Sequence, residues 1–249
     1  SRAPYLHQGF IPEKEKGNLY SPVYDLNALE WRGIGKGFSK GIVVLRDPRD
    51  IVVSLLYSHL YSHASGPRVD YSRRRLFDLP NMEARLSHLF GHNSTNMRFL
   101  LSWSDYTEND VFIVRYEDLI QQQQEIFSKI FDWLGWKLSE EMVSAIIDRH
   151  SFKRRSGRSP GETDPVSHFR RGLAGDWKNH FTRDLGKLWE GLFPQFLTTM
   201  GYEKCNDWWC DLPEDISAVS ANIPSREQEE LEAQRRRIAF LETQSREKE

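Results

Sequence analysis

The chain has 249 residues, of which 34 are Lys or Arg and 36 are Asp or Glu, so its formal net charge is −2. This near balance excludes an overall field that would attract nucleic acid or an acidic membrane, and any anion site must therefore be local. No apolar stretch approaches the roughly 20 residues of a membrane-spanning helix, and no signal peptide opens the sequence. The cysteines, Cys205 and Cys210, are too few for a disulfide framework, although a local bridge between them stays open. These features predict a cytoplasmic, reduced protein that binds no nucleic acid.

Two segments lack the spacing of regular structure. Residues 1–40 are rich in glycine, proline and charge, and residues 65–80 are polar and basic, so both are expected to be irregular or exposed loops. Within the first, the stretch GIGKGFSKG at 33–41 is interpreted as a surface loop. A phosphate-binding loop follows a strand, whereas this stretch precedes one.

Apolar runs and helical spacing alternate along the rest of the chain. The runs Ile42–Leu45 and Val111–Val114 are typical of buried parallel strands, and each is followed by an arginine, Arg46 and Arg115. Helical spacing is found at 48–60, 82–106, 120–134, 139–147, 182–200 and, as a charged tail, 225–249. This alternation predicts an α/β fold with a parallel sheet flanked by helices. Ligands of such sheets bind beyond the carboxyl ends of the strands, where both arginines lie.

Arg46 and Ser54 are the first candidates for an anion site. Asp47 and Pro48 are suited to the N-cap and first position of a helix that would carry Ser54. A guanidinium offers a forked set of donors suited to phosphate, and a hydroxyl from the next helix could add a donor to the same anion. The residues alone leave a plainer interpretation open, in which Arg46 forms a surface ion pair and Ser54 is an ordinary helix serine.

A long segment at 151–181 holds the second set of candidates. Its Arg170, Arg171 and Gly172 place two guanidinium groups beside a flexible backbone that can approach an anion closely. A solvated basic loop would show the same residues, so both interpretations stay open.

Other chemistry-bearing residues give weaker signals. Tyr116 and Phe152 lie in or beside turns, where each could stack on a base or belong to the core. Two pairs of histidines spaced four residues apart lack the adjacent glutamate of a zinc-protease helix, so no metal site is predicted.

Four stretches, in this order, resemble the motifs of one enzyme family. They are VVLRDPRDIVVS at 43–54, VRYEDL at 114–119, HSF at 150–152 and FRRGLAGDWKNHF at 169–181. Together they are similar to the sulfotransferases that use 3′-phosphoadenosine-5′-phosphosulfate (PAPS), over about Ile42 to Gly201. The resemblance implies the parallel α/β architecture of these P-loop-NTPase-like enzymes.

The resemblance also implies roles for the candidate residues. Arg46 and Ser54 would bind the 3′-phosphate of the donor. Arg170, Arg171 and Gly172 would close over the same phosphate from the long segment at 151–181, called the late loop below. The aromatic pair Tyr116 and Phe152 would line the adenine pocket. A further set would be largely structural, holding the turns that aim these donors: Arg49, Asp50, Glu117, Asp118, Asp176 and Trp177.

The chain departs from the family pattern at its start. Family members open with a strand and a phosphate-binding loop containing Lys-Ser/Thr-Gly-Thr, and no such sequence is present here. Because the sequence also begins with Ser1 and not Met, we expect a fragment or an incomplete gene model of a longer enzyme, with a natural pseudoenzyme as the alternative. The family's general base is a histidine upstream of the arginine motif, and His7 is the one histidine upstream of Arg46.

The implied reaction moves a sulfuryl group from PAPS to an acceptor hydroxyl or amine, without a metal. The acceptor would be a small molecule, a lipid or a carbohydrate. Residues 1–205 would form the sulfotransferase-like domain, and residues 206–249 a linker and charged helical tail that could bind a partner weakly. The loop Lys153–His168 is predicted to be a mobile lid that orders when the donor binds.

Two other classes of protein stay open as alternatives. A nucleotide kinase of the same architecture would need a glycine-rich loop with lysine and a magnesium-binding carboxylate at a strand end, where this chain has arginines. The other is a catalytically inactive nucleotide-binding or partner-binding module derived from the same fold.

Overall fold

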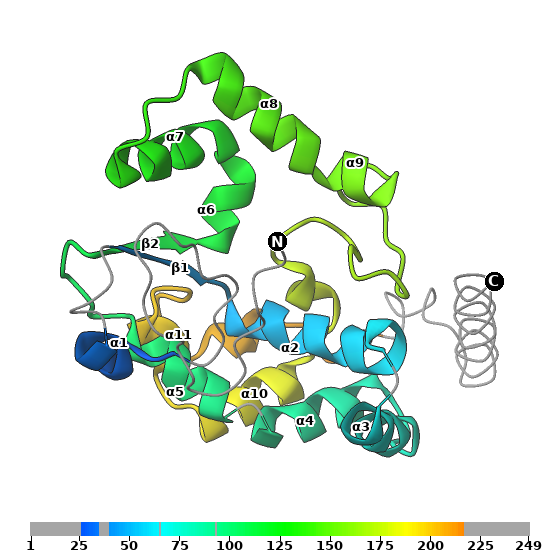
Figure 1. Cartoon of the computed structure of the whole chain (residues 1–249). Helices are drawn as coiled ribbons and strands as arrows, with labels where there is room; N and C mark the ends of the chain where they lie inside the picture. The colour runs from blue at the N-terminus through cyan, green and yellow to red at the C-terminus, as the bar shows by residue number, and fades with distance from the viewer. Residues whose placement is uncertain (1–25, 35–39, 65, 93, 217–249) are drawn as a thin grey trace.

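The computed structural model describes residues 26–34, 40–64, 66–92 and 94–216. Within these ranges it contains a two-stranded parallel sheet, β1 (Gly41–Leu45) beside β2 (Val111–Arg115), with helices on both sides (Figure 1). The strands pair in register from end to end, so both terminate at the same edge of the sheet. The expected α/β fold with a parallel sheet flanked by helices is confirmed.

The helices fall into two groups by their place in the chain. Before β2 the structure has α1 (Ala28–Ile34), α2 (Pro48–Tyr57), the π-helical turn η2 (Ser58–Ser62), α3 (Pro67–Phe77), α4 (Met82–His92) and α5 (Ser94–Ser102). After β2 it has α6 (Tyr116–Gln121), α7 (Gln123–Leu134), α8 (Glu140–His150), α9 (Phe152–Ser156), the 3₁₀ turn η3 (Asp176–Asn179), α10 (Arg183–Leu192), α11 (Phe196–Thr199) and the 3₁₀ turn η4 (Trp208–Asp211).

The two faces of the sheet are covered differently. One face of each strand joins the main core, which is built with α1, α2, α4, α5, α10 and α11. On the other face Val114 of β2 packs against α7, whereas Ile42 and Val44 of β1 are 44% and 49% exposed. The prediction of a fully buried first strand is therefore wrong for one face, because the apolar stripe of α7 packs on β2.

The sequence signals at the start of α2 are confirmed. The Asp47 carboxylate accepts a hydrogen bond from the Arg49 N–H at 2.9 Å, and Pro48 is the first helical residue. The helix buries Val52 and Leu56 in the main core and continues into η2. Consequently the N-terminus of α2 is fixed directly beyond the end of β1.

Two helices form where irregular structure was expected. α1 begins with a capping box, in which the side chains of Asn27 and Glu30 each accept the other's backbone N–H, and its Trp31 is buried. α3 is polar but buries Leu76, and the Arg73 guanidinium donates to backbone carbonyls in η2 and to that of His63 directly after it. Tertiary contacts that composition does not reveal stabilise both helices.

Helix ends later in the chain agree with the sequence. Ser139 and Thr182 cap α8 and α10 with their hydroxyls, and the left-handed Gly135 ends α7. Cys205 and Cys210 are exposed free thiols, so the local bridge that was left open does not form. No helix in the described ranges is long and apolar enough to cross a membrane.

The predicted division of the chain after residue 205 stays a prediction. The charged tail at 217–249 lies outside the described residues. What the structure does show is that Trp208 of η4 is buried against the ring of Trp177, with ring centres 5.8 Å apart.

Candidate functional site

The first half of the candidate site forms where the two strands end. Arg46 follows β1 and Tyr116 follows β2, and the in-register pairing brings them together. The Arg46 guanidinium carbon lies 4.6 Å from the centre of the Tyr116 ring, a cation–π contact. Nη2 of Arg46 lies 3.8 Å from Oδ2 of Asp50, and its buried Nε has no hydrogen-bond partner among the described residues. Arg46 therefore keeps donor capacity for an anion.

Ser54 lies on α2, one turn beyond Asp50. Residues four apart on a helix share a face, so these two side chains lie one above the other. Arg46 approaches the same face from the strand end, through its ion pair with Asp50. The structure thus gathers the predicted early residues, Arg46, Ser54 and Tyr116, around the first two turns of α2.

Asp50 joins this half of the site to the late loop. Its buried carboxylate accepts the N–H of Gly175 at 2.7 Å and the N–H of Trp177 at 2.9 Å. Burial raises the pKa of Asp50, although these N–H groups and the charge of Arg46 favour the ionised form. Because Gly175 and Trp177 flank Asp176, one carboxylate on α2 fixes the turn that opens η3.

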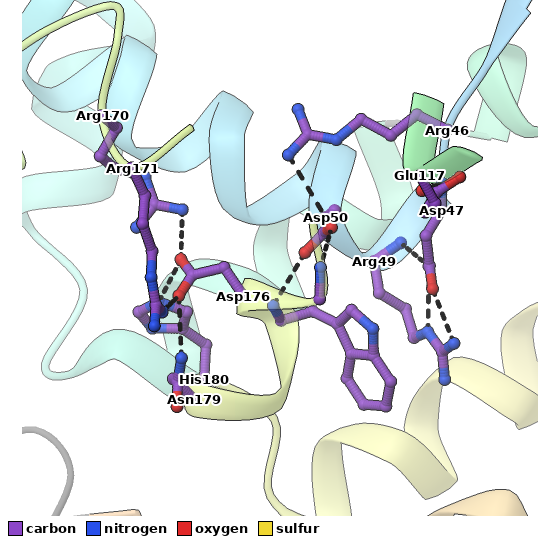
Figure 2. Close-up of polar contacts among 12 residues, drawn as sticks. Arg46, Asp47, Arg49, Asp50, Glu117, Arg170, Arg171, Asp176, Asn179 and His180 are labelled. Atoms are coloured by element: carbon purple, nitrogen blue, oxygen red, sulfur yellow. Dashed lines mark hydrogen bonds and ion pairs between the residues drawn. The ribbon is translucent and has the colours of Figure 1, made fainter. Parts of the chain in front are cut away.

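The second half of the site is built around Asp176 (Figure 2). Arg170 and Arg171 both converge on its carboxylate, each pairing with one oxygen. Asn179 donates to Oδ1 at 2.9 Å, and Nε2 of His180 lies 3.2 Å from Oδ2. Burial opposes charge on Asp176, but the His180 hydrogen bond and the Arg170 charge outweigh it and hold its pKa well below the usual range. The late loop therefore presents two arginines oriented by one stable anion.

Gly172 and Phe152 pack directly on each other. Gly172 has a φ of 69°, in the left-handed region that favours glycine, and a Cβ there would lie 2.4 Å from Cδ2 of Phe152. This contact joins the first residue of α9 to the backbone that follows the two arginines. The structure thus brings Phe152, Arg170, Arg171 and Gly172 together as one unit.

Neighbouring charged residues hold the turns on which the site depends. Arg49 is 2% exposed, pairs with Asp47 at 2.7 Å, and has its guanidinium carbon 3.6 Å from the centre of the Trp177 ring. Glu117 accepts the N–H of Asp47 at 2.8 Å, and burial raises the pKa of this glutamate. These contacts connect the end of β1, the start of α6 and the turn at η3.

Arg115 does not face the ligand edge of the sheet. Its guanidinium donates to the carbonyl oxygen of Met200 and lies 4.7 Å from the centre of the Tyr202 ring. The prediction that both strand-end arginines face the crevice is therefore wrong for Arg115, because its side chain instead ties β2 to the turn after α11.

One arginine near the site has a role that the sequence does not indicate. Arg158 donates to the carbonyl oxygens of Glu162, Phe169 and Arg170, beside the two arginines of the late loop. Backbone acceptors leave no mark in a sequence, so no residue pattern could have indicated this role.

The chemistry that the site offers is anion binding. Three guanidinium groups, those of Arg46, Arg170 and Arg171, are held along α2 by the buried Asp50 and Asp176. Arg46 lies at the start of this helix, whereas the guanidinium carbon of Arg170 lies 4.4 Å from the ring centre of Tyr57 at its end. Within the described ranges no group of three or more His, Cys, Asp or Glu is arranged to hold a metal ion. The predicted base His7 and the glycine-rich residues 35–39 lie outside the described residues.

Comparison with known proteins agrees with this geometry. The family model for the sulfotransferase domain matches residues 36–201, and the chain belongs to this family.

Individual relatives share part of the chain. It is 30% identical to sulfotransferase 6B1 of Danio rerio over 158 residues, covering 62% of this chain and 50% of that protein. It is also 30% identical over 155 residues to the 3-beta-hydroxysteroid sulfotransferase of Cavia porcellus, covering 58% and 51%. The chain thus spans about half the length of these curated relatives. Its fold is similar to the crystal structure of mouse sulfotransferase SULT7A1 complexed with PAP, with a TM-score of 0.54 and 18% identity over 75% of this chain and 67% of that one.

Proposed function

We propose that this chain acts as a sulfotransferase that moves a sulfuryl group from PAPS to an acceptor hydroxyl or amine. The observation that carries the proposal is the placement of Arg46, Arg170 and Arg171 along α2, each paired with a buried carboxylate, inside the region matched by the family model. The mouse structure of similar fold contains PAP, the nucleotide that PAPS leaves behind.

The 3′-phosphate is the group that we assign to these arginines. Arg46 binds it from the end of β1 and Ser54 from α2, while Arg170, Arg171 and the N–H of Gly172 bind it from the late loop. The buried Nε atoms of Arg46 and Arg171, which have no partner among the described residues, fit an anion placed between the two halves. Charge-assisted hydrogen bonds of this kind contribute roughly 1.5–3 kcal/mol each, which is enough to separate this donor from nucleotides without a 3′-phosphate.

Tyr116 and Phe152 are assigned to the adenine. The Tyr116 ring lies against the Arg46 guanidinium, and the Phe152 ring lies against Gly172, so a base stacked on either ring would lie near residues that we assign to the 3′-phosphate.

The reaction needs in-line positioning and neutralisation of charge on the departing nucleotide. The acceptor oxygen forms a bond to sulfur as the bond between sulfur and the 5′-phosphate oxygen breaks, and PAP departs with that electron pair. The acceptor proton passes to a general base, for which His7 is our candidate.

The acceptor is proposed to be a small molecule that carries a hydroxyl group. Support comes from the relative named for a 3-beta-hydroxysteroid, a small alcohol. Lipids and carbohydrates that carry hydroxyl groups, and amines, are further acceptors to assay. A cytoplasmic location is proposed as well, because the two exposed thiols are unpaired.

Calorimetric binding of PAP and AMP to the parent chain and to Arg46→Ala tests the donor site. We expect PAP to bind more tightly than AMP. Arg46→Ala should weaken the binding of PAP roughly ten- to a hundredfold and change the binding of AMP little. Arg32→Ala is the matched control, because Arg32 also pairs with a carboxylate, Glu108, and lies 5.2 Å from the Tyr106 ring centre, away from the site.

A folded chain that binds PAP and AMP equally would show that no 3′-phosphate site exists here. Binding of PAP by the chain, combined with no sulfuryl transfer from PAPS to any tested hydroxyl, would instead support the inactive nucleotide-binding module derived from this fold.

A further inference from the structure

The segment between α9 and the two arginines folds back on the arginine backbone. The N–H of Gly161 donates to the carbonyl of Arg171 at 2.8 Å, and the N–H of Asp164 donates to the carbonyl of Arg170 at 2.9 Å. Residues 158–172 therefore form a loop whose two sides are joined by backbone hydrogen bonds. We call this loop the phosphate arm. Since the arm carries Arg170, Arg171 and Gly172, its conformation decides where both guanidinium groups point.

One side chain, that of Arg158, fills the centre of the phosphate arm. Its Nη1 donates to the carbonyls of Glu162 at 2.6 Å and Arg170 at 3.1 Å, and its Nη2 donates to the carbonyl of Phe169 at 2.6 Å. The carboxylate of Asp164 lies 3.9 Å away and balances the charge. A guanidinium is the one side chain whose planar fork can serve three carbonyls in this way.

Arg158 is also anchored at its own backbone and against a ring. The Ser156 hydroxyl accepts the N–H of Arg158 at 3.1 Å, which fixes the position from which the side chain extends. The guanidinium carbon lies 5.5 Å from the centre of the Phe152 ring, the same ring that packs on Gly172. Arg158 thus lies between the aromatic residue and the two arginines, with its donors directed at carbonyls of the arm.

We infer that Arg158 is a positioning residue of the donor site, which pre-forms the phosphate arm and couples the arginines to Phe152. This inference rests on the proposed function for its effect on nucleotide binding. Without Arg158 the carbonyls of Phe169 and Arg170 lose their shared partner, and the arm gains conformations that a nucleotide must remove on binding. Because the arm contacts the 3′-phosphate, this ordering cost falls on PAP more than on AMP.

The inference makes the opposite prediction to a mobile lid over the overlapping stretch 158–168. A lid that orders only when the donor binds would leave the amides of Gly161 and Asp164 free to exchange in the absence of nucleotide. An arm held by Arg158 protects both amides before any nucleotide is added.

Two readouts on Arg158→Ala, Arg158→Lys and Arg154→Ala test the inference. Arg154 is the matched control, since it lies on the neighbouring α9 and forms an exposed ion pair with Asp148. In hydrogen exchange without nucleotide, we expect the amides of Gly161 and Asp164 to exchange at least tenfold faster in Arg158→Ala, with an intermediate rate in Arg158→Lys. In calorimetry, we expect Arg158→Ala to weaken the binding of PAP about tenfold and the binding of AMP by less. Arg154→Ala should bind both nucleotides as the parent chain does.

Two results would overturn the inference: unprotected amides of Gly161 and Asp164 in the parent chain, or unchanged protection and unchanged PAP affinity in Arg158→Ala. Thermal melting checks that each variant is folded, and Arg158→Lys supplies the comparison if the alanine variant is not. Failure of the parent to bind PAP would count against the proposed function alone, because the exchange measurement needs no nucleotide.

Discussion

The two halves of the candidate site differ in what holds their arginines. Arg46 lies against the Tyr116 ring with one ion pair at 3.8 Å and an unpartnered Nε. Arg170 and Arg171 are both engaged by the Asp176 carboxylate, and Arg158 holds the backbone from which Arg170 projects. The early half therefore depends on one long ion pair, whereas in the late half both guanidinium groups pair with the same buried carboxylate.

This difference indicates that the two halves should respond differently to substitution. A change at Arg46 removes one set of donors and leaves its surroundings in place. A change in the late half disturbs a network in which each group orients the next, so its effect should exceed that of a single lost contact. The following predictions test this contrast, beginning with the largest expected effect.

Gly172→Ala should have the largest effect on nucleotide binding. The substitution is strained by the φ of 69° and would bring its Cβ to 2.4 Å from Phe152, so the ring or the arm must move. We expect about 2–4 kcal/mol less stability and roughly a hundredfold weaker PAP binding. Chemical denaturation and calorimetry measure the two quantities.

Gly157→Ala is the control that separates the effect of backbone strain at a positive φ from the effect of the clash with Phe152. Gly157 has a similar φ of 74° but nothing within 4 Å of an added Cβ, so it should lose only about 1 kcal/mol and keep its PAP affinity. Equal losses of PAP affinity in both variants would show that the contact between Gly172 and Phe152 has no part in the site.

Asp50→Asn should uncouple the two halves. Asparagine has one acceptor oxygen, so its amide would face the N–H of either Gly175 or Trp177. We expect a loss of about 1–3 kcal/mol in stability and about tenfold in PAP affinity, as the turn before Asp176 shifts.

The matched control is Asp110→Asn, because Asp110 also accepts two hydrogen bonds, from Trp31 and from Tyr106. It should lose similar stability and keep its PAP affinity. If the two variants bound PAP equally, Asp50 would be a stabilising residue without influence on the late half.

The contrast between the halves also explains what the sequence could predict. The early half follows local rules: an apolar run ends at Leu45, Asp47 and Pro48 begin a helix, and parallel strands bring Arg46 beside Tyr116. Arg115 obeys the same rules and still points elsewhere, because the choice between the crevice and the Met200 carbonyl is made by the packing of a distant segment.

The late half depends on contacts that the sequence does not display. Asp50 and Gly175 are 125 residues apart, and the partners of Arg158 are backbone carbonyls. The motif resemblance located Arg170, Arg171 and Gly172 but gave no geometry for them. The helix α3 was missed for a similar reason, since its composition is that of a solvated loop and its stability comes from Leu76 and from Arg73 contacting carbonyls of His59, Leu60 and His63.

The phosphate arm also contacts the segment beyond the end of α2, where His59 of η2, His63 and His168 gather. The His59 and His63 rings have centres 5.4 Å apart, and His63 and His168 have centres 5.9 Å apart. Burial, with the charges of His63, Arg73 and Arg68, lowers the pKa of His59 from its ordinary 6.5 to about 4. His168 belongs to the phosphate arm, so protonation here acts where the arm touches the helix.

The smallest predicted effect is a loss of stability in mild acid. Because the pKa of His59 is lower in the folded chain, the unfolded chain binds more protons between pH 6.5 and about 4. Stability should therefore fall over this window as the pH falls, by about 1 kcal/mol between pH 7 and pH 5 once solvent screening of the half-buried ring is allowed for. His59→Asn, which can keep the contact with the Ser72 hydroxyl, should remove this part of the pH dependence, and His150→Gln at the exposed end of α8 should not. Denaturant unfolding at several pH values measures the free energy of unfolding in each variant. Identical pH profiles for the parent and His59→Asn would show that His59 does not contribute to the pH dependence of stability.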